Sequence, residues 1–305
     1  LSTQNDIVEE IARLYGYHNL VSTLPTVPIK TGEYIGEVKY RKQISKRLRR
    51  LGLNETKTYT LVSQDMAKKF NYEEKEKVVI PNPMSVDKSV VRTSIIPSLL
   101  NVYDYNKKRK VKDVMLYEIS KTYDKTYNED IKVAGLMAGN YISNGWNMAQ
   151  KVDFYVVKGI IQNLLDYMGF SNRYSLEIGN TVDLHPGISA NILLDRKRIG
   201  IIGRIHPNIN KDEIYVFEIS LNKLMTKIKP IKFKEAPKYP AIEKDAAYIL
   251  DKNISADNII KTIKQAGGKL LTNVDIFDVY TGSNIEKNKK SIAFNYIFMD
   301  STRTL

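Results

Sequence analysis

Apolar residues recur along the chain with two different spacings, and each spacing predicts one kind of element. Spacing of three or four positions predicts helices over residues 6–15, 37–51, 97–106, 152–169 and 256–266. Alternation and short apolar runs predict strands over residues 55–62, 78–80, 114–119, 133–138, 188–194, 199–204, 215–220, 246–250, 274–280 and 291–299. Strands dominate residues 114–220 and we expect helices to cover one side of them, so the pattern indicates an antiparallel α+β fold.

Prolines among lysines mark a linker that divides the chain, at Pro230, Pro237 and Pro240. The elements after it run strand, helix, strand, strand, which is the opening of a ferredoxin-like fold. The second helix and fourth strand of that fold are missing, so we expect an incomplete domain. The predicted parts are an N-terminal segment (1–29), a core (30–228) and the incomplete domain (229–305).

The chain is strongly basic, which favours a polyanionic partner. It carries 47 Lys and Arg against 34 Asp and Glu, a net charge of +13. Neutralising a phosphate releases counterions, so such charge favours nucleic-acid contact over a merely solvated surface. The predicted helix over residues 37–51 concentrates charge on its outward face, in Lys39, Arg41, Lys42, Lys46, Arg47, Arg49 and Arg50.

Composition narrows the setting of the protein. The absence of Cys excludes disulfides and thiolate metal sites and fits a reducing compartment, so we expect a cytoplasmic protein. No apolar stretch is long enough to span a bilayer, and no signal segment is visible. Because the sequence starts at Leu1 rather than Met, we expect it to be a fragment of a longer chain.

An ordered string of short motifs resembles one known family. Residues 6–17 (DIVEEIARLYGY) resemble the end of the B5 domain in bacterial phenylalanine–tRNA ligase β subunits. The segments that resemble the family's catalytic-like core are residues 82–85 (NPMS), 92–94 (RTS), 97–100 (PSLL), 116–119 (LYEI), 185–187 (HPG) and 205–207 (IHP). Residues 238–242 (KYPAI) and 266–280 resemble its ferredoxin-fold anticodon-binding domain. The motifs follow the family's order along essentially the whole chain.

The resemblance implies an enzyme of two α and two β subunits that attaches phenylalanine to its tRNA with ATP. The α subunit would bind ATP and carry the chemistry, whereas the β core would copy the fold of a class II synthetase without its working site. This chain would supply subunit interface, tRNA-binding surface and part of a Mg²⁺ site, and would be inactive alone. The expected fold is then a class II synthetase-like antiparallel sheet core with flanking helices, followed by a truncated ferredoxin-like βαβ domain.

The residues themselves argue against a working catalytic site. Adenylate formation needs positive charge against the phosphates, usually from arginines on the central strands. The strand around Glu118 contains no Arg, and we interpret the lone Arg204 on a later strand as surface or interface charge, so we expect no catalytic residue. Two alternatives stay open: a free-standing nucleic-acid-binding module, and an active class II ligase, against which the missing arginine speaks. A large apolar interface would distinguish a subunit from a module.

Asp6, Glu9 and Glu10 form the most specific chemical cluster. Their spacing of i, i+3 and i+4 places three carboxylates on one helix face, where they repel unless a cation or the helix N-terminus compensates. The resemblance implies that they ligate a Mg²⁺ ion shared with the α subunit. A fourth ligand of the family, an Asp six positions upstream of Asp6, would lie before Leu1. The alternative is that the three acids only complement the helix dipole.

The last domain is expected to contact RNA through charges at its strand ends. On strand 291–299 the natural core face comprises Ile292, Phe294, Tyr296 and Phe298. The opposite face is small and polar, so it offers few platforms on which bases could stack. The predicted phosphate contacts are Lys287, Lys289, Lys290 and Arg303. The alternative is that these charges only keep the domain soluble, which for Lys287 is the favoured interpretation.

Overall fold

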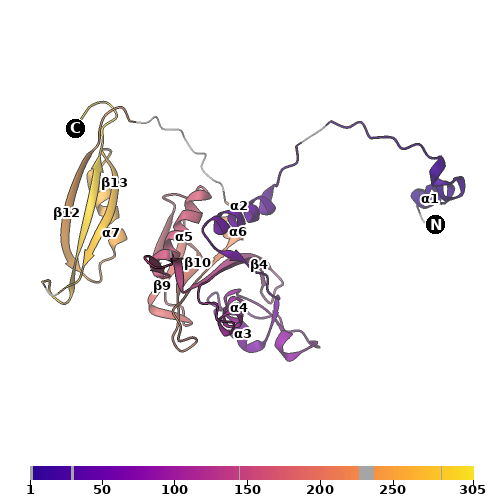
Figure 1. The fold of residues 1–305 in the computed structure, drawn as a ribbon, viewed down its shortest axis with the longest axis horizontal. Helices are drawn as coiled ribbons and strands as arrows, with labels where there is room; N and C mark the ends of the chain where they lie inside the picture. The colour runs from indigo at the N-terminus through magenta and orange to yellow at the C-terminus, as the bar shows by residue number, and fades with distance from the viewer. Residues whose placement is uncertain (1–2, 29–30, 144, 227–236, 283) are drawn as a thin grey trace. The chain divides into compact units, whose positions relative to one another are not determined.

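The computed structural model describes residues 3–28, 31–143, 145–226, 237–282 and 284–305. The chain divides into two compact units, Leu1–Lys229 and Pro230–Leu305, which can be followed by colour in Figure 1. Of the predicted linker prolines, Pro237 and Pro240 are described, whereas Pro230 lies outside the described residues. Within the described ranges, no helix is long and apolar enough to cross a membrane.

The N-terminal segment forms helix α1 (Gln4–Tyr15), as predicted. A capping box begins it: the Asp6 N–H donates to the Thr3 hydroxyl, and the Thr3 N–H donates to the Asp6 carboxylate. The helix ends at Gly16, whose φ of 91° favours glycine, and a 3-10 turn (Tyr17–Asn19) follows. No residue of α1 is buried by other described residues, so its apolar stripe is exposed.

The first unit is built on a seven-stranded sheet with the order β1-β4-β5-β11-β10-β9-β8. Its strands are β1 (Asn54–Glu55), β4 (Val114–Tyr123), β5 (Glu129–Ala138), β8 (Tyr174–Ile178), β9 (Leu184–Leu194), β10 (Lys197–Ile205) and β11 (Ile214–Ser220). Every neighbouring pair is antiparallel except β1 and β4. The predicted antiparallel sheet is therefore confirmed.

Helices pack on both faces of this sheet, so the expectation that they cover one side is wrong. One apolar cluster joins α2 (Gly36–Arg50) and α5 (Phe154–Tyr167) to one face, and a second joins α4 (Ile96–Lys108) to the other. Successive side chains of β4 point to opposite faces of the sheet, so Tyr117 belongs to the first cluster and Leu116 to the second. Figure 1 shows α2 and α5 on one side of β4 and α4 on the other.

The predicted continuous strand over residues 55–62 is wrong. β1 ends after two residues, and the chain enters a separate small sheet as β2 (Leu61–Val62), which pairs with β3 (Val90–Val91). Between them, the backbone and hydroxyl of Thr58 donate hydrogen bonds to the side chain of Glu118 instead of extending a ladder. A buried carboxylate thus interrupts a segment whose side chains alone favour a strand.

The remaining elements of the first unit are short. The predicted strand over residues 78–80 is reduced to one bridge between Val79 and Val90. The sequence pattern did not predict β3, β8 or the 3-10 turn at Tyr17–Asn19. It also did not predict α3 (Gln64–Lys68), a 3-10 helix (Val86–Lys88), β6 (Asn140–Ser143), β7 (Ala149–Lys151) and α6 (Leu221–Leu224).

The second unit has the predicted strand–helix–strand–strand order. Its elements are β12 (Ile242–Asp251), α7 (Ala256–Gly267), β13 (Leu271–Tyr280) and β14 (Lys289–Phe298). The three strands form an antiparallel sheet in the order β12-β14-β13. On β14, Ile292, Phe294 and Tyr296 are buried in a cluster with α7, so the predicted core face is confirmed.

Candidate functional site

Three charged residues lie buried on the face of the first sheet that α4 covers. Glu118 on β4, Lys132 on β5 and Glu218 on β11 are each at most 1% exposed. Their strands are neighbours, and the pleat places these side chains on the same face as Leu116 and Val216, which pack in the α4 cluster. A buried charge is tolerated where it is paired, so the partners of these side chains decide what this centre can do.

Glu118 is neutralised by Arg92, which is itself only 1% exposed. The Arg92 guanidinium Nη2 lies 2.7 Å from Oε1 of Glu118, and its Nη1 donates to the Thr58 hydroxyl at 2.6 Å. That hydroxyl in turn donates to Oε2 of Glu118 at 2.7 Å. The three side chains form a closed triangle in which charge and hydrogen-bonding capacity are largely satisfied.

Lys132 and Glu218 form a second buried pair beside the first. The ammonium of Lys132 lies 3.0 Å from Oε2 of Glu218 and donates to the carbonyl oxygen of Thr93 at 3.0 Å. The other oxygen of Glu218 accepts from the Ser94 hydroxyl at 2.9 Å and from the Ile95 N–H at 2.7 Å. Residues 92–95 are therefore tied in succession to β4, β5 and β11.

A less buried acid extends the pair towards solvent. Burial alone would raise the pKa of Glu73, but the charges of Lys132, Lys75 and Lys223 outweigh it and lower this pKa to about 2. Burial alone would likewise lower the pKa of Lys132, but Glu218 and Glu73 raise it overall. The cationic form of Lys132 and the anionic form of Glu73 are thus both favoured. We call Arg92, Glu118, Lys132, Glu218 and Glu73, with their partners, the buried charge network.

The buried charge network holds the chain in place rather than presenting charge to a ligand. Each of its carboxylates accepts from a cation within the fold, so none of these cations is aimed at a phosphate. Arg204 on β10 lies apart from it and faces Glu213 at 3.6 Å. The sequence interpretation missed Arg92, Lys132 and Glu218. In the sequence, a buried charge of this kind is indicated by a single charged residue inside an apolar run, such as Lys132 between Ile131 and Val133.

Two of the three predicted metal ligands have partners within α1. Asp6 takes part in the α1 capping box, and Glu10 lies 2.5 Å from the guanidinium of Arg13. Across the described residues, no group of three or more His, Cys, Asp or Glu is arranged to hold a metal ion. Asp6, Glu9 and Glu10 thus form no complete metal site within the described residues, and their role as part of a Mg²⁺ site shared with the α subunit stays a prediction.

The predicted RNA contacts of the second unit differ in how they are held. Lys289 and Arg303 make ion pairs with Glu286 at 3.0 Å and Asp300 at 3.4 Å. Lys290 instead donates to the carbonyl oxygens of residues 252 and 254, at 3.0 and 2.6 Å, which ties the turn after β12. Lys287 is exposed. All four stay predictions, and Lys290 has a clear structural role as well.

The sheet face opposite α7 is acidic, which the sequence interpretation missed. Cross-strand partners of Ala293, Asn295 and Ile297 on β14 share their face, and these partners include Glu243, Asp245, Asp275 and Asp278. One of them, Asp245, accepts from the Asn295 amide at 2.8 Å. The signal was visible in β13, where Asp275 and Asp278 flank an apolar pair, but only the strand register assigns both to one face. This face would repel phosphate.

The basic face of α2 is partly neutralised within the fold. Arg41 pairs with Glu37 at 3.2 Å, and Arg47 donates to Asn163 at 2.6 Å. Lys46, Arg49 and Arg50 are exposed and remain the strongest cationic part of this helix. They are compatible with a phosphate backbone.

Sequence models of two domain families match the chain. The phenylalanyl tRNA synthetase beta chain CLM domain matches residues 20–221, and the ferredoxin-fold anticodon binding domain matches residues 237–305. The chain belongs to the phenylalanine–tRNA ligase β subunit family. Both the resemblance drawn from its motifs and the predicted fold class are confirmed.

Relatives of this family match along the entire chain. It is 37% identical over 317 residues to the phenylalanine–tRNA ligase β subunit of Bacillus subtilis (strain 168), covering 100% of this chain and 39% of that protein. The β subunits of Geobacillus kaustophilus and Listeria monocytogenes (serotype 4b) are 37% and 35% identical over 316 residues, with the same coverage. The chain thus spans about two-fifths of the length of these relatives.

A solved structure of lower similarity also aligns with the chain. The crystal structure of pyrrolysyl-tRNA synthetase from Desulfitobacterium hafniense aligns with a TM-score of 0.48 and 11% identity, over 61% of this chain and 67% of that chain. A likeness of that size carries no argument about function.

Proposed function

We propose that this chain is part of the β subunit of a phenylalanine–tRNA ligase and provides scaffold, subunit interface and tRNA-binding surface. The ligase attaches phenylalanine to its tRNA with ATP, works in the cytoplasm and contains two α and two β subunits. The α subunit carries the catalytic site and binds ATP, and Mg²⁺ serves at the α/β contact. The β subunits to which the chain is 35–37% identical support the family role.

The buried charge network is the observation that carries the non-catalytic role. An adenylating site needs cations that face a developing phosphate charge. On this sheet, the Arg92 guanidinium is ion-paired with Glu118 at 2.7 Å and the Lys132 ammonium with Glu218 at 3.0 Å. Releasing either cation to a ligand would leave a carboxylate buried without its partner, at a cost of about 3–5 kcal/mol.

The exposed apolar stripe of α1 supports a subunit rather than a free-standing module. Ile7, Ile11 and Leu14 are 52%, 61% and 78% exposed although they share one helix face. Contiguous apolar side chains of this kind are rarely left in water and mark a surface that another polypeptide covers. We infer that α1 is covered in the assembled enzyme.

Binding of tRNA is expected from charges outside the acidic sheet face. Asp245 and Asp275 flank the centre of that face, so phosphates would approach the second unit from the turn and strand ends that carry Lys287, Lys289 and Arg303. The net charge of +13 favours this partner for the whole chain.

Phenylalanine-dependent exchange of pyrophosphate into ATP tests the proposal. The purified 305-residue chain should give no exchange, whereas the assembled ligase should. The chain should also capture a purified α subunit, and Leu14→Asp should weaken this capture, because a charge enters the covered stripe. Ile178→Asp is the matched control, since Ile178 is 86% exposed on β8. Exchange by the chain alone, or equal capture by both variants, would overturn the corresponding part.

A further inference from the structure

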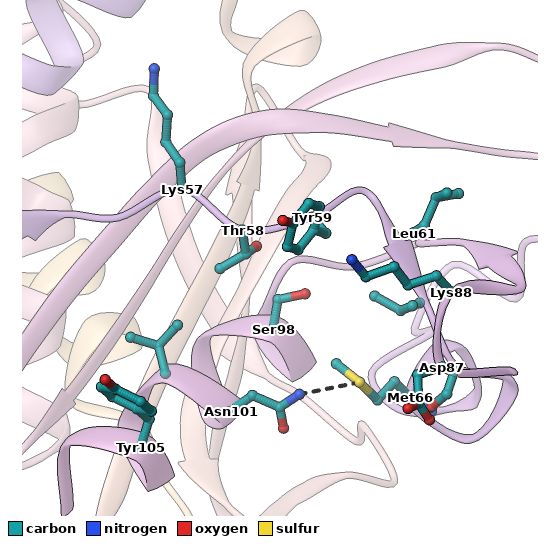
Figure 2. A pocket seen from close by; sticks show the side chains of 13 residues that line it. Lys57, Thr58, Tyr59, Leu61, Met66, Asp87, Lys88, Ser98, Asn101 and Tyr105 are labelled. Carbon is teal, nitrogen blue, oxygen red and sulfur yellow. Dashed lines mark hydrogen bonds between the residues drawn. The ribbon is translucent and has the colours of Figure 1, made fainter. Parts of the chain in front are cut away.

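A pocket of about 570 Å³ lies between the segment that follows β1 and helix α4. Figure 2 shows Ser98, Asn101 and Tyr105 on the helix side and Tyr59 and Lys88 across from them. This volume falls in the range of roughly 300–1,000 Å³ that is typical of small-ligand sites. The pocket lies beside the buried charge network but is open to solvent, and none of the roles described above uses it.

Two exposed tyrosines give the pocket flat aromatic surfaces. Tyr59 is 72% exposed and Tyr105 is 57% exposed, so most of each ring is open to a ligand. A cation accompanies each ring: the Lys88 ammonium lies 3.7 Å from the Tyr59 centroid, and the Arg109 guanidinium lies 3.4 Å from the Tyr105 centroid. Each cation lies over one face of its ring and leaves the other face for a base. Aromatic rings beside cations are the pattern by which proteins stack unpaired bases and neutralise the adjoining phosphates.

Polar groups between the tyrosines could bind the edge of a base. The Asn101 amide nitrogen donates to the sulfur of Met66 at 3.3 Å. A thioether is a weak acceptor, so a ring nitrogen or carbonyl oxygen of a base would replace it with a gain. Ser98 adds a hydroxyl group to the same lining, whereas the Thr58 hydroxyl is engaged by Glu118 and Arg92. An amide and a hydroxyl suit base edges, whereas a purely apolar ligand would leave them unsatisfied.

Positive charge continues from the pocket along the end of α4. The run from Lys107 to Lys112 follows Tyr105 and holds exposed cations at Lys108 and Lys110. Lys107 instead pairs with Asp212. Asp87 also lines the pocket, so phosphate is expected at the rim near Lys57 and Lys88 rather than deep inside.

We propose that this pocket binds an unpaired stretch of RNA, with bases stacked on Tyr59 and Tyr105 and phosphates at Lys88 and the C-terminal end of α4. The inference rests on the proposed function only in taking tRNA as the source of that RNA. It adds a second RNA contact, within the first unit and separate from the strand ends of the second unit. It also gives a role to the basic run at residues 107–112.

The test measures binding of a fluorescent single-stranded hexaribonucleotide to the 305-residue chain at low salt. Tyr59→Ala and Tyr105→Ala should each weaken binding by about fivefold or more, because a base loses its stacking surface. Tyr59→Phe should bind the probe as the unchanged chain does, because it keeps the aromatic ring. Tyr155→Ala is the matched control, since Tyr155 is 74% exposed on α5, on the opposite face of the sheet. Thermal melting should be unchanged in all of them.

Three results would overturn the proposal. Alanine variants that bind the probe as the unchanged chain does would remove the tyrosines from the site. A duplex of the same sequence that binds as tightly as the single strand would mean that charge alone is recognised. Loss of α-subunit capture in Tyr59→Ala, with unchanged RNA affinity, would assign the pocket to a protein side chain. Failure of the proposed function would appear separately, as pyrophosphate exchange by the chain alone.

Discussion

Removal of the Arg92 guanidinium is the most direct perturbation of the buried charge network. Arg92→Met keeps a long side chain but leaves the Glu118 carboxylate, which is 1% exposed, with hydrogen bonds from Thr58 in place of a charge partner. Breaking one side of a buried pair costs about 3–5 kcal/mol. Replacing both partners, as in Arg92→Met/Glu118→Leu, should recover most of that loss, because the uncompensated charge is removed with its partner.

Urea unfolding followed by circular dichroism measures this difference. With a slope of about 1–3 kcal/mol per molar urea, a loss of 3 kcal/mol lowers the midpoint by roughly 1–3 M. The matched control is Lys125→Met, because Lys125 pairs with Glu76 at 2.7 Å with both side chains at least 67% exposed. Such exposed pairs contribute about 0–1 kcal/mol. If Arg92→Met costs no more than Lys125→Met, or if the double variant is as unstable as the single one, the reasoning about the network is refuted.

Two further predictions concern pH and RNA. The pKa of Glu73 lies near 2, below its ordinary value of 4.5, so its ionised form stabilises the fold above pH 4.5 and this contribution is lost as pH falls from 4.5 to 2. Glu73→Gln should flatten the loss of stability in that window, whereas Glu74→Gln, at an exposed neighbour, should not; equal acid profiles for both would contradict it. In the assembled ligase, Lys289→Ala should make the log–log salt dependence of tRNA affinity shallower by about 0.7–0.9 if it removes a phosphate contact. Lys264→Ala on α7 is the control, and an unchanged slope and affinity for Lys289→Ala would remove it from the binding surface.

The alternation of apolar residues predicted most strands because it reports local geometry. β4, β5, β10 and β11 were all located, and the order of elements in the second unit was correct. The segment 55–62 failed for a non-local reason. Its apolar and β-branched side chains favour a strand, but Thr58 is drawn to Glu118, a residue 60 positions away, and leaves the ladder.

The sequence pattern also could not predict that helices cover both faces of the sheet. A strand buried on both sides reads as a continuous apolar run, so β4 and β5 carry no alternation that would show which face lacks a helix. The prediction that helices cover one side assumed that β4 and β5 are buried on one face only. Tyr117 and Leu116, adjacent in sequence, in fact pack in different clusters.

Residue spacing predicted which candidate site residues share one helix, but not which partners their side chains contact. Spacing correctly placed Asp6, Glu9 and Glu10 on one helix, but their partners depended on the neighbours Thr3 and Arg13, which occupy two of the three carboxylates. Lys132 and Glu218 lie 86 positions apart and meet because β5 pairs with β11. The spacing of residues within a strand does not predict which other strand it pairs with.

The buried charge network and the pocket are coupled through the start of α4. Ser94 and Ile95 bond to Glu218 directly before α4 begins at Ile96, so the network fixes where that helix starts. The same helix carries Asn101 and Tyr105 into the pocket. A variant that loosens the network should therefore weaken binding of single-stranded RNA as well as stability, whereas removal of an exposed tyrosine should weaken binding alone. This asymmetry separates a residue that positions α4 from one that contacts the ligand.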